Sequence, residues 1–145
     1  MTILGIDPGA SGGIAIVGVV TEAVKMPDTE RDLIELVREY ARQADRAVIE
    51  RVSAMPGNGV AGMFKFGMSY GALRMALIAV GIPFEAVTPA KWQSGLGVPK
   101  RGGKTKTQHK NVLKAKAQEL FPALKITHAT ADALLIAEWG RRNRP

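Results

Sequence analysis

The stretch GIDPGASGGIAIV, residues 5–17, decides the fold, because one apolar strand ends within it and a second begins. Residues 2–6 are predicted to form a buried strand that ends on the acidic side chain of Asp7. Pro8 and the glycines that follow predict a turn, and residues 12–20 continue as the second strand. The small residues after Asp7 have two explanations: a flexible hairpin, or space for a bulky group to approach the carboxyl group.

The remaining elements alternate between strand and helix. A short third strand over residues 21–26 would complete an antiparallel meander with the first two. Helices are predicted over 27–45, 60–80, 105–120 and 129–142, strands over 46–50 and 82–87, and a short helix or turn over 88–92. This order predicts an α/β fold in which helices flank a five-stranded mixed sheet, with three antiparallel strands and then two parallel ones. No repeat or internal boundary interrupts the pattern, so we expect a single domain over residues 1–145.

Apolar side chains cover more than one face of the helix predicted over residues 60–80, which predicts burial on two sides. Gly67 and Gly71 lie four residues apart on this helix. Their missing side chains would let another backbone approach closely. Packing onto the sheet and contact with a second subunit both explain this pattern.

The composition narrows the chemistry and the compartment. The chain has no cysteine, which excludes disulfides, thiolate metal sites and cysteine nucleophiles. The N-terminus lacks a basic region followed by a long apolar run, and no stretch is apolar over the ~18 residues of a membrane span. We therefore expect a cytoplasmic protein without a membrane partner.

Basic side chains are concentrated in one part of the chain. The net charge is +7, and residues 86–118 contain no acid. A surplus of this size favours a polyanionic partner such as nucleic acid. Lys106, Lys110 and Lys114 recur every four residues, so they would form one helix face that follows a phosphate backbone. A solvated helix face is the alternative, but such faces usually mix charges of both signs.

Three acidic residues each lie at an end of an apolar strand or helix, and we expect these ends to meet at one edge of the sheet. Asp7 ends the first strand and Glu50 the fourth, so parallel neighbouring strands would bring these carboxylates to ~5 Å from each other. Asp132 lies near the start of the last helix, and His128 precedes it by four residues. Carboxylates this close repel unless a cation lies between them, and oxygen ligands suit Mg²⁺. Each residue alone has a simpler explanation, as turn former, strand end or helix cap, and only the shared edge favours a metal site.

Four motifs, in this order, resemble the RuvC family of Holliday-junction resolvases, which has a ribonuclease H-like fold. They are GIDPG at 5–9, IER at 49–51, KFGMSYGALRMAL at 65–77 and ATADALLIAEW at 129–139. The resemblance spans nearly the whole chain. The chain is shorter than typical bacterial members of the family, and this length favours a phage-type member. Such a protein would act in the cytoplasm of a bacterial host.

The resemblance implies a catalytic and metal-binding set. The first acid of the family corresponds to Asp7, the second to Glu50 and the last to Asp132. With them, the family implies two Mg²⁺ ions in each active site, for which Mn²⁺ can substitute. Family members carry a further acid or histidine three residues before the last Asp, where this chain has Ala129. His128 stands one residue further back, and two roles are open for it: a metal ligand, or a proton carrier at the scissile phosphate.

The resemblance also implies DNA contacts and a homodimer. The two functional lysines of the family correspond to Lys91 and Lys106, with Lys104 as a rival for the second. With Lys110 and Lys114 from the basic helix face, the predicted DNA-binding residues are Lys91, Lys104, Lys106, Lys110 and Lys114, together with Met55 and Phe64 in or after the loop that enters the junction centre. A loop without order is the alternative for this segment. The helix that carries Gly67 and Gly71 is the expected dimer contact.

These features predict that the protein is a metal-dependent endonuclease that needs no small-molecule cofactor. We expect it to cut four-way or other branched DNA by paired symmetric nicks. A ribonuclease H-like nuclease acting on RNA or RNA–DNA hybrids is the second possibility. A junction-binding protein without catalysis is the third. The carboxylates argue against the third, because a pure binder gains nothing from acids beside a polyanion.

Overall fold

The fold is described from a computed structural model, which covers residues 1–54, 57 and 59–145. Along this part of the chain the elements are β1 (Ile3–Asp7), β2 (Gly13–Val17), β3 (Glu22–Lys25), α1 (Glu30–Ala41), β4 (Arg46–Glu50), α2 (Val60–Val80), β5 (Phe84–Val87), α3 (Pro89–Gly95), α4 (Lys106–Leu120) and α5 (His128–Arg142). The second strand is shorter than predicted, because residues 18–20 bend before β3 begins.

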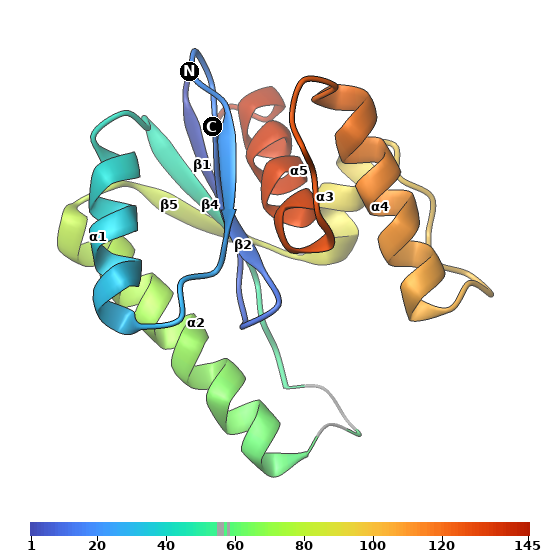
Figure 1. The fold of residues 1–145 in the computed structure, drawn as a ribbon, viewed down its shortest axis with the longest axis horizontal. Helices are drawn as coiled ribbons and strands as arrows, with labels where there is room; N and C mark the ends of the chain where they lie inside the picture. The colour runs from blue at the N-terminus through green and yellow to red at the C-terminus, as the bar shows by residue number, and fades with distance from the viewer. Residues whose placement is uncertain (55–56, 58) are drawn as a thin grey trace.

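The strands form one five-stranded sheet in the order β3-β2-β1-β4-β5 (Figure 1). β1 pairs antiparallel with β2 and parallel with β4, while β2 pairs antiparallel with β3 and β4 pairs parallel with β5. The predicted mixed sheet, with three antiparallel strands followed by two parallel ones, is confirmed. The parallel pairs place the carboxyl ends of β1, β4 and β5 at the same edge.

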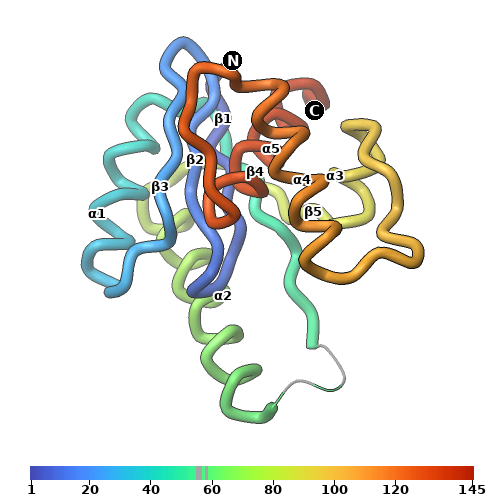
Figure 2. The backbone as a smooth tube through the Cα atoms, turned by 45° about the vertical axis from the view of Figure 1, so that its right-hand side comes forward, coloured from blue at the N-terminus to red at the C-terminus, as the bar shows by residue number. Residues whose placement is uncertain are grey.

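Helices cover both faces of the sheet, with α1 and α2 on one face and α3, α4 and α5 on the other (Figures 1 and 2). Side chains alternate along each strand, so successive residues enter different cores. Leu4 and Ile6 of β1 pack with Leu33 and Leu77 from α1 and α2. Ile3, on the same strand, belongs to the core beneath α5.

Helix α5 lies directly against the sheet because glycines leave room for its backbone. A Cβ atom on Gly5 of β1 would lie 2.6 Å from the backbone nitrogen of Ala137. A Cβ on Gly140 of α5 would lie 2.7 Å from Cγ2 of Val48. Any larger residue at these positions would force the helix away from β1 and β4.

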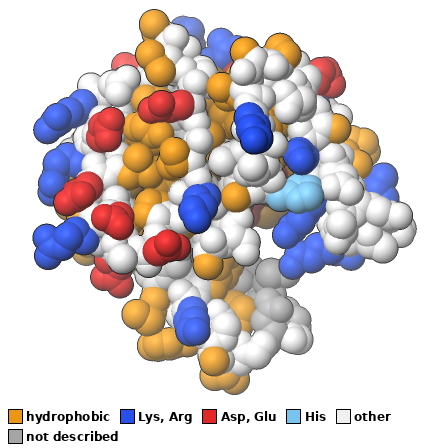
Figure 3. All heavy atoms as spheres, viewed as in Figure 1, with side chains coloured by type: hydrophobic (Ala, Val, Ile, Leu, Met, Phe, Trp, Pro, Cys, Tyr) orange, Lys and Arg blue, Asp and Glu red, His pale blue; other side chains and the backbone are white. Residues whose placement is uncertain are grey.

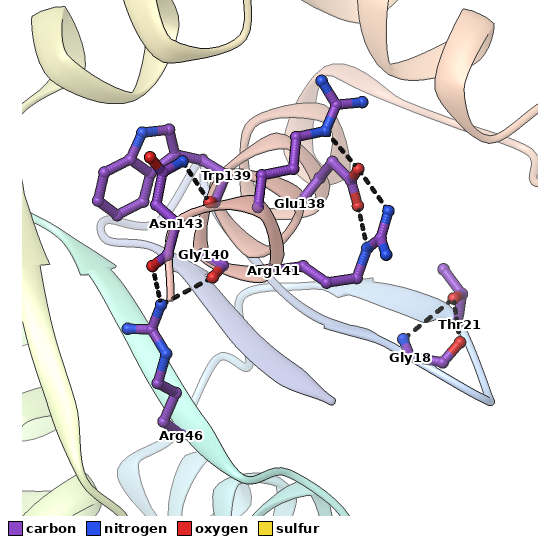
Figure 4. Close-up of polar contacts among 9 residues, drawn as sticks. Gly18, Thr21, Arg46, Glu138, Trp139, Gly140, Arg141 and Asn143 are labelled. Atoms are coloured by element: carbon purple, nitrogen blue, oxygen red, sulfur yellow. Dashed lines mark hydrogen bonds and ion pairs between the residues drawn. The ribbon is translucent and has the colours of Figure 1, made fainter. Parts of the chain in front are cut away.

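The C-terminal end of α5 is fixed by polar contacts (Figure 4). The Arg46 guanidinium, on β4, donates to the carbonyl oxygens of Gly140 and Asn143, both at 2.7 Å. The buried carboxylate of Glu138 accepts from Arg141 and Arg142, each with a contact at 2.7 Å. The bonds from Arg46 hold the end of α5 against β4, whereas the contacts of Glu138 lie within the helix.

The prediction that α2 is buried on two sides is wrong within this chain. Its buried residues are Leu73, Ala76 and Leu77, all in the C-terminal half. Phe64 is 69% exposed and Met75 is 62% exposed. The N-terminal half of α2 extends beyond the sheet (Figure 1), so nothing in the described residues covers its second apolar face.

The sequence predicted no apolar stretch long enough to span a membrane, but α2 is, by length and composition alone, the one helix among the described residues that could do so, and 17% of its most apolar window is buried.

Candidate active site

Asp7 and Glu50 end neighbouring parallel strands on the same face of the sheet. The last paired residues of β1 and β4 are Ile6 and Ile49, and each acid is the next residue of its strand. Because side chains alternate, Asp7 shares its face with Gly5, which lies against α5. Glu50 shares its face with Val48, which belongs to the core beneath α5. Both carboxyl groups therefore lie on the α5 side of the sheet, on strands ~4.8 Å apart.

The third acid, Asp132, comes to this edge on α5. The Cα partner of Asp7 on β2 is Gly13, and a Cβ on Gly13 would collide with the carbonyl of Ala129, in the first turn of α5. The start of α5 therefore lies over the ends of β1 and β2. Asp132 lies three residues after Ala129, and its charge raises the pKa of both Asp7 and Glu50.

Burial raises the pKa of all three acids, and repulsion from neighbouring carboxylates raises the pKa of Asp7 and Glu50 further. Burial raises the pKa of Asp7 well above its usual value, and the charges of Asp132 and Glu50 raise it further. Burial raises the pKa of Glu50 to about 7, against a hydrogen bond from Trp92 that lowers it. Burial raises the pKa of Asp132 to about 6. The ionised forms of these acids are therefore disfavoured at this edge of the sheet, and the chain itself compensates their charge only in part.

Lys110 of α4 supplies the positive charge that partly compensates these acids. It lowers the pKa of Asp7 and of Asp132. Lys106 and Lys114 lie one turn to either side of it on the same helix. The predicted basic face of α4 is therefore directed, through Lys110, towards the predicted acidic site.

The chemistry of these donors fits a divalent cation, although the side chains do not form a closed set of ligands. Across residues 1–54, 57 and 59–145, no group of three or more His, Cys, Asp or Glu side chains is positioned to hold a metal ion. The acids are coupled through their charges, and a cation would relieve both the repulsion and the cost of burying them. Carboxylate oxygens are the ligands that Mg²⁺ prefers.

His128 lies on the same helix as Asp132, at its first position. Its exposed ring is hydrogen-bonded through Nε2 to Oδ1 of Asn111, on α4, at 2.8 Å. This contact ties the start of α5 to the basic helix. Neither role considered for His128, as metal ligand or as proton carrier, is tested by this geometry.

The other predicted DNA-binding residues lie at different places. Lys91 of α3 lies over the ring of Trp139, with its Nζ 5.6 Å from the ring centroid. Lys104 is exposed in the loop before α4, and Phe64 is exposed on α2. Met55 lies outside the described residues.

Gly67 and Gly71, the predicted dimer residues, are exposed on α2, and a Cβ added to either would meet nothing within 4 Å. Hydrophobic side chains gather at this lower end of the molecule, over the N-terminal half of α2 (Figure 3).

The loop after Asp7 is a compact turn. The backbone nitrogen of Gly12 donates to the carbonyl of Gly9 at 3.0 Å. Gly9 has a φ of +101°, which favours glycine, and a Cβ there would lie 2.8 Å from the ring of Phe66. Phe66 of α2 therefore fills part of the space that the small residues leave.

Sequence reasoning missed Trp92 as a residue of this site. Its indole nitrogen donates to Oε2 of Glu50 at 2.8 Å, and its side chain is fully buried. The β4–β5 register pairs Glu50 with Val87, and α3 begins two residues after Val87. Nothing in the local sequence shows that a tryptophan of this short helix contacts the end of β4.

Comparison with solved structures identifies the architecture. The chain is similar to the structure of RuvC from Thermus thermophilus, with 21% identity and a TM-score of 0.63 over 98% of this chain and 96% of that one. It is also similar to T. thermophilus RuvC in complex with a Holliday junction substrate, with 20% identity and a TM-score of 0.63 over 98% of this chain and 95% of that one. No protein-family model matches the chain, and no curated protein matches it significantly. The fold of this chain is therefore RuvC-like, a mixed sheet of the ribonuclease H type flanked by helices.

Proposed function

We propose that this protein is a metal-dependent endonuclease that cuts four-way DNA junctions by paired, symmetric nicks. The observation that carries the proposal is the electrostatic coupling of Asp7, Glu50 and Asp132 at one edge of the sheet. A neighbour of the same fold is RuvC in complex with a Holliday junction substrate, which favours junction DNA over other nucleic acids as the partner.

Asp7, Glu50 and Asp132 would hold the metal. Mg²⁺, or Mn²⁺ in its place, supplies a water activated as nucleophile and stabilises the leaving oxygen of a phosphodiester. The three carboxylates would hold the cation at this edge of the sheet, where its positive charge would attract the scissile phosphate. Lys110 attracts that phosphate to the acidic edge, and Lys106 and Lys114 extend the contact along the backbone of the DNA.

Paired nicks require two active sites, and α2 offers a surface for a second copy of the chain. Its exposed apolar residues and glycines recur at intervals of three and four as Val60, Phe64, Gly67, Gly71, Met75 and Ile78. At about 100° per residue these positions form one stripe, opposite the buried face of Leu73, Ala76 and Leu77. Two such stripes can pack around a two-fold axis, and a four-way junction shares that symmetry.

The one-sided character of α2 favours a protein partner over a bilayer. A membrane-spanning helix meets lipid on every side unless other helices cover it, whereas the C-terminal half of α2 packs onto the sheet and contacts α1. We therefore assign the apolar stripe to a homodimer.

The test is a cleavage assay with a synthetic four-way junction, a linear duplex and an RNA–DNA hybrid, each with and without Mg²⁺. Symmetric nicks confined to the junction, and lost in Asp7→Asn, are expected. Cutting of the hybrid would favour a ribonuclease H-like activity. Tight junction binding without cutting would favour a binding protein.

A further inference from the structure

We propose that Trp92 is a positioning residue that orients the Glu50 carboxylate for a divalent cation, a role that rests on the proposed function. Its indole Nε1 donates to Oε2 of Glu50 at 2.8 Å, and none of its side chain is exposed. Trp92 does not touch DNA or metal in this role. It acts through Glu50.

The backbone explains why the indole lies where it does. Val87, the last residue of β5, pairs with Glu50. The side chain of Thr88 caps α3 by accepting from the backbone nitrogen of Lys91, which fixes the direction of the helix immediately after the strand. Trp92 then lies on the inner side of α3, in the core that also contains Leu96 and Leu113.

The hydrogen bond constrains one oxygen of Glu50 and leaves the other for a cation. The indole nitrogen is a donor only, so it favours an acceptor that carries negative charge. Because the buried ring packs on several sides, it cannot follow Glu50 if that side chain turns. Partners of this kind, which hold a ligand in place without binding the metal, commonly change metal affinity by about 10- to 100-fold when they are removed.

A buried tryptophan could instead make this bond only to satisfy its own nitrogen, and the chain offers a matched control for that explanation. Trp139 is the second of the two tryptophans and belongs to the same core, where it is 4% exposed. It lies on α5, with its indole nitrogen against Gly95. Trp92→Phe and Trp139→Phe both remove a buried indole, but only the first removes the bond to Glu50.

The first measurement is the affinity of the protein for Mn²⁺ in the absence of DNA. Electron paramagnetic resonance detects the free ion and so measures how much of it is bound. We expect Trp92→Phe to weaken Mn²⁺ binding by about 10-fold or more, and Trp139→Phe to leave it close to that of the wild-type protein. An equal loss of Mn²⁺ affinity in the two variants, or no loss in Trp92→Phe, would overturn the positioning role of Trp92. This conclusion does not depend on which substrate the wild-type protein cleaves.

The second measurement remains decisive even if Trp92→Phe does not fold. Trp139→Phe leaves Trp92 as the only emitting indole, beside Glu50. Its fluorescence should change in a saturable way as Mg²⁺ is added, and the change should be absent when Glu50→Gln is combined with Trp139→Phe. A flat signal in Trp139→Phe, under conditions where Mn²⁺ binding saturates, contradicts the inference.

These outcomes are separate from the test of the proposed function. If the wild-type protein binds metal and cuts no junction, the proposed function fails, while the two tryptophan variants still decide the role of Trp92. If the wild-type protein binds no divalent cation, both proposals fail.

Discussion

Lys110, on α4, lowers the pKa of Asp7 at the end of β1, so the basic helix and the acidic edge of the sheet form one site. The same lysine lowers the pKa of Asp132 on α5. A nuclease site needs both charges, because the cation requires carboxylates and the approaching phosphate requires a positive neighbour. The predictions below separate these contributions.

Lys110→Ala is expected to reduce the rate of junction cleavage by about 10-fold or more, since it removes the positive charge that lowers the pKa of Asp7 and Asp132. Lys106→Ala should have a smaller effect, and Lys116→Ala the smallest, because Lys116 lies off the basic face and pairs with Glu119 at 3.8 Å. Single-turnover cleavage with saturating enzyme measures the three variants. Equal rates for Lys106→Ala and Lys116→Ala would remove the argument for a basic face.

Asp7→Asn is expected to keep the affinity for a four-way junction and to lose cleavage. The substitution removes a proposed metal ligand, and the loss of several kcal/mol of transition-state stabilisation would correspond to about 10³-fold in rate. It also removes a negative charge near the DNA, so binding should not weaken. Gel-shift titrations and cleavage assays measure the two effects, with Asp28→Asn, an exposed acid outside the site, as the control. A fully active Asp7→Asn variant would exclude the metal site.

The raised pKa of Glu50 predicts a loss of stability as pH rises in protein without metal. The usual value is 4.5, and burial raises the pKa of Glu50 to about 7 in the folded chain. Between these values the unfolded chain releases the proton while the folded chain retains it, so stability falls over this range and then levels off.

Glu50→Gln removes this dependence, because its amide oxygen still accepts from Trp92 but carries no charge. In the presence of a chelator, the free energy of unfolding of the variant should exceed that of the wild-type protein by about 3 kcal/mol at about pH 8, or roughly 10 °C in Tm. The difference should vanish at about pH 4. Thermal denaturation at the two pH values measures it, with Glu35→Gln on α1 as the control. A constant difference between variant and wild type at both pH values would contradict the prediction.

Met75→Glu is expected to convert a dimer into monomers. Met75 lies on the exposed stripe of α2 beside Gly71, and a dimer interface would bury the new charge without a partner. Sedimentation velocity measures the oligomeric state. Val24→Glu places the same charge on the exposed strand β3 and should leave the dimer intact. A wild-type protein that sediments as a monomer would contradict the assignment of the stripe.

Local patterns in the sequence were sufficient for the order of the elements and for the identity of the acids. The antiparallel hairpin that follows Asp7 is encoded within a few neighbouring residues, and the structure confirms it. Asp7 and Glu50 could be paired in advance, because the connection between their strands implied parallel neighbours. Asp132 could be assigned only through the resemblance and the expected position of the last helix.

Contacts between distant segments were decided by the tertiary structure. Trp92 contacts Glu50 because β5 pairs with β4 and α3 follows at once, and the charge of Lys110 acts on Asp7 because α4 packs beside α5. The second apolar face of α2 looked buried from its composition, yet it is exposed, because composition records which side chains are apolar and not what covers them. Periodicity is a property of neighbouring residues, whereas burial and charge coupling depend on which elements the folded chain brings together.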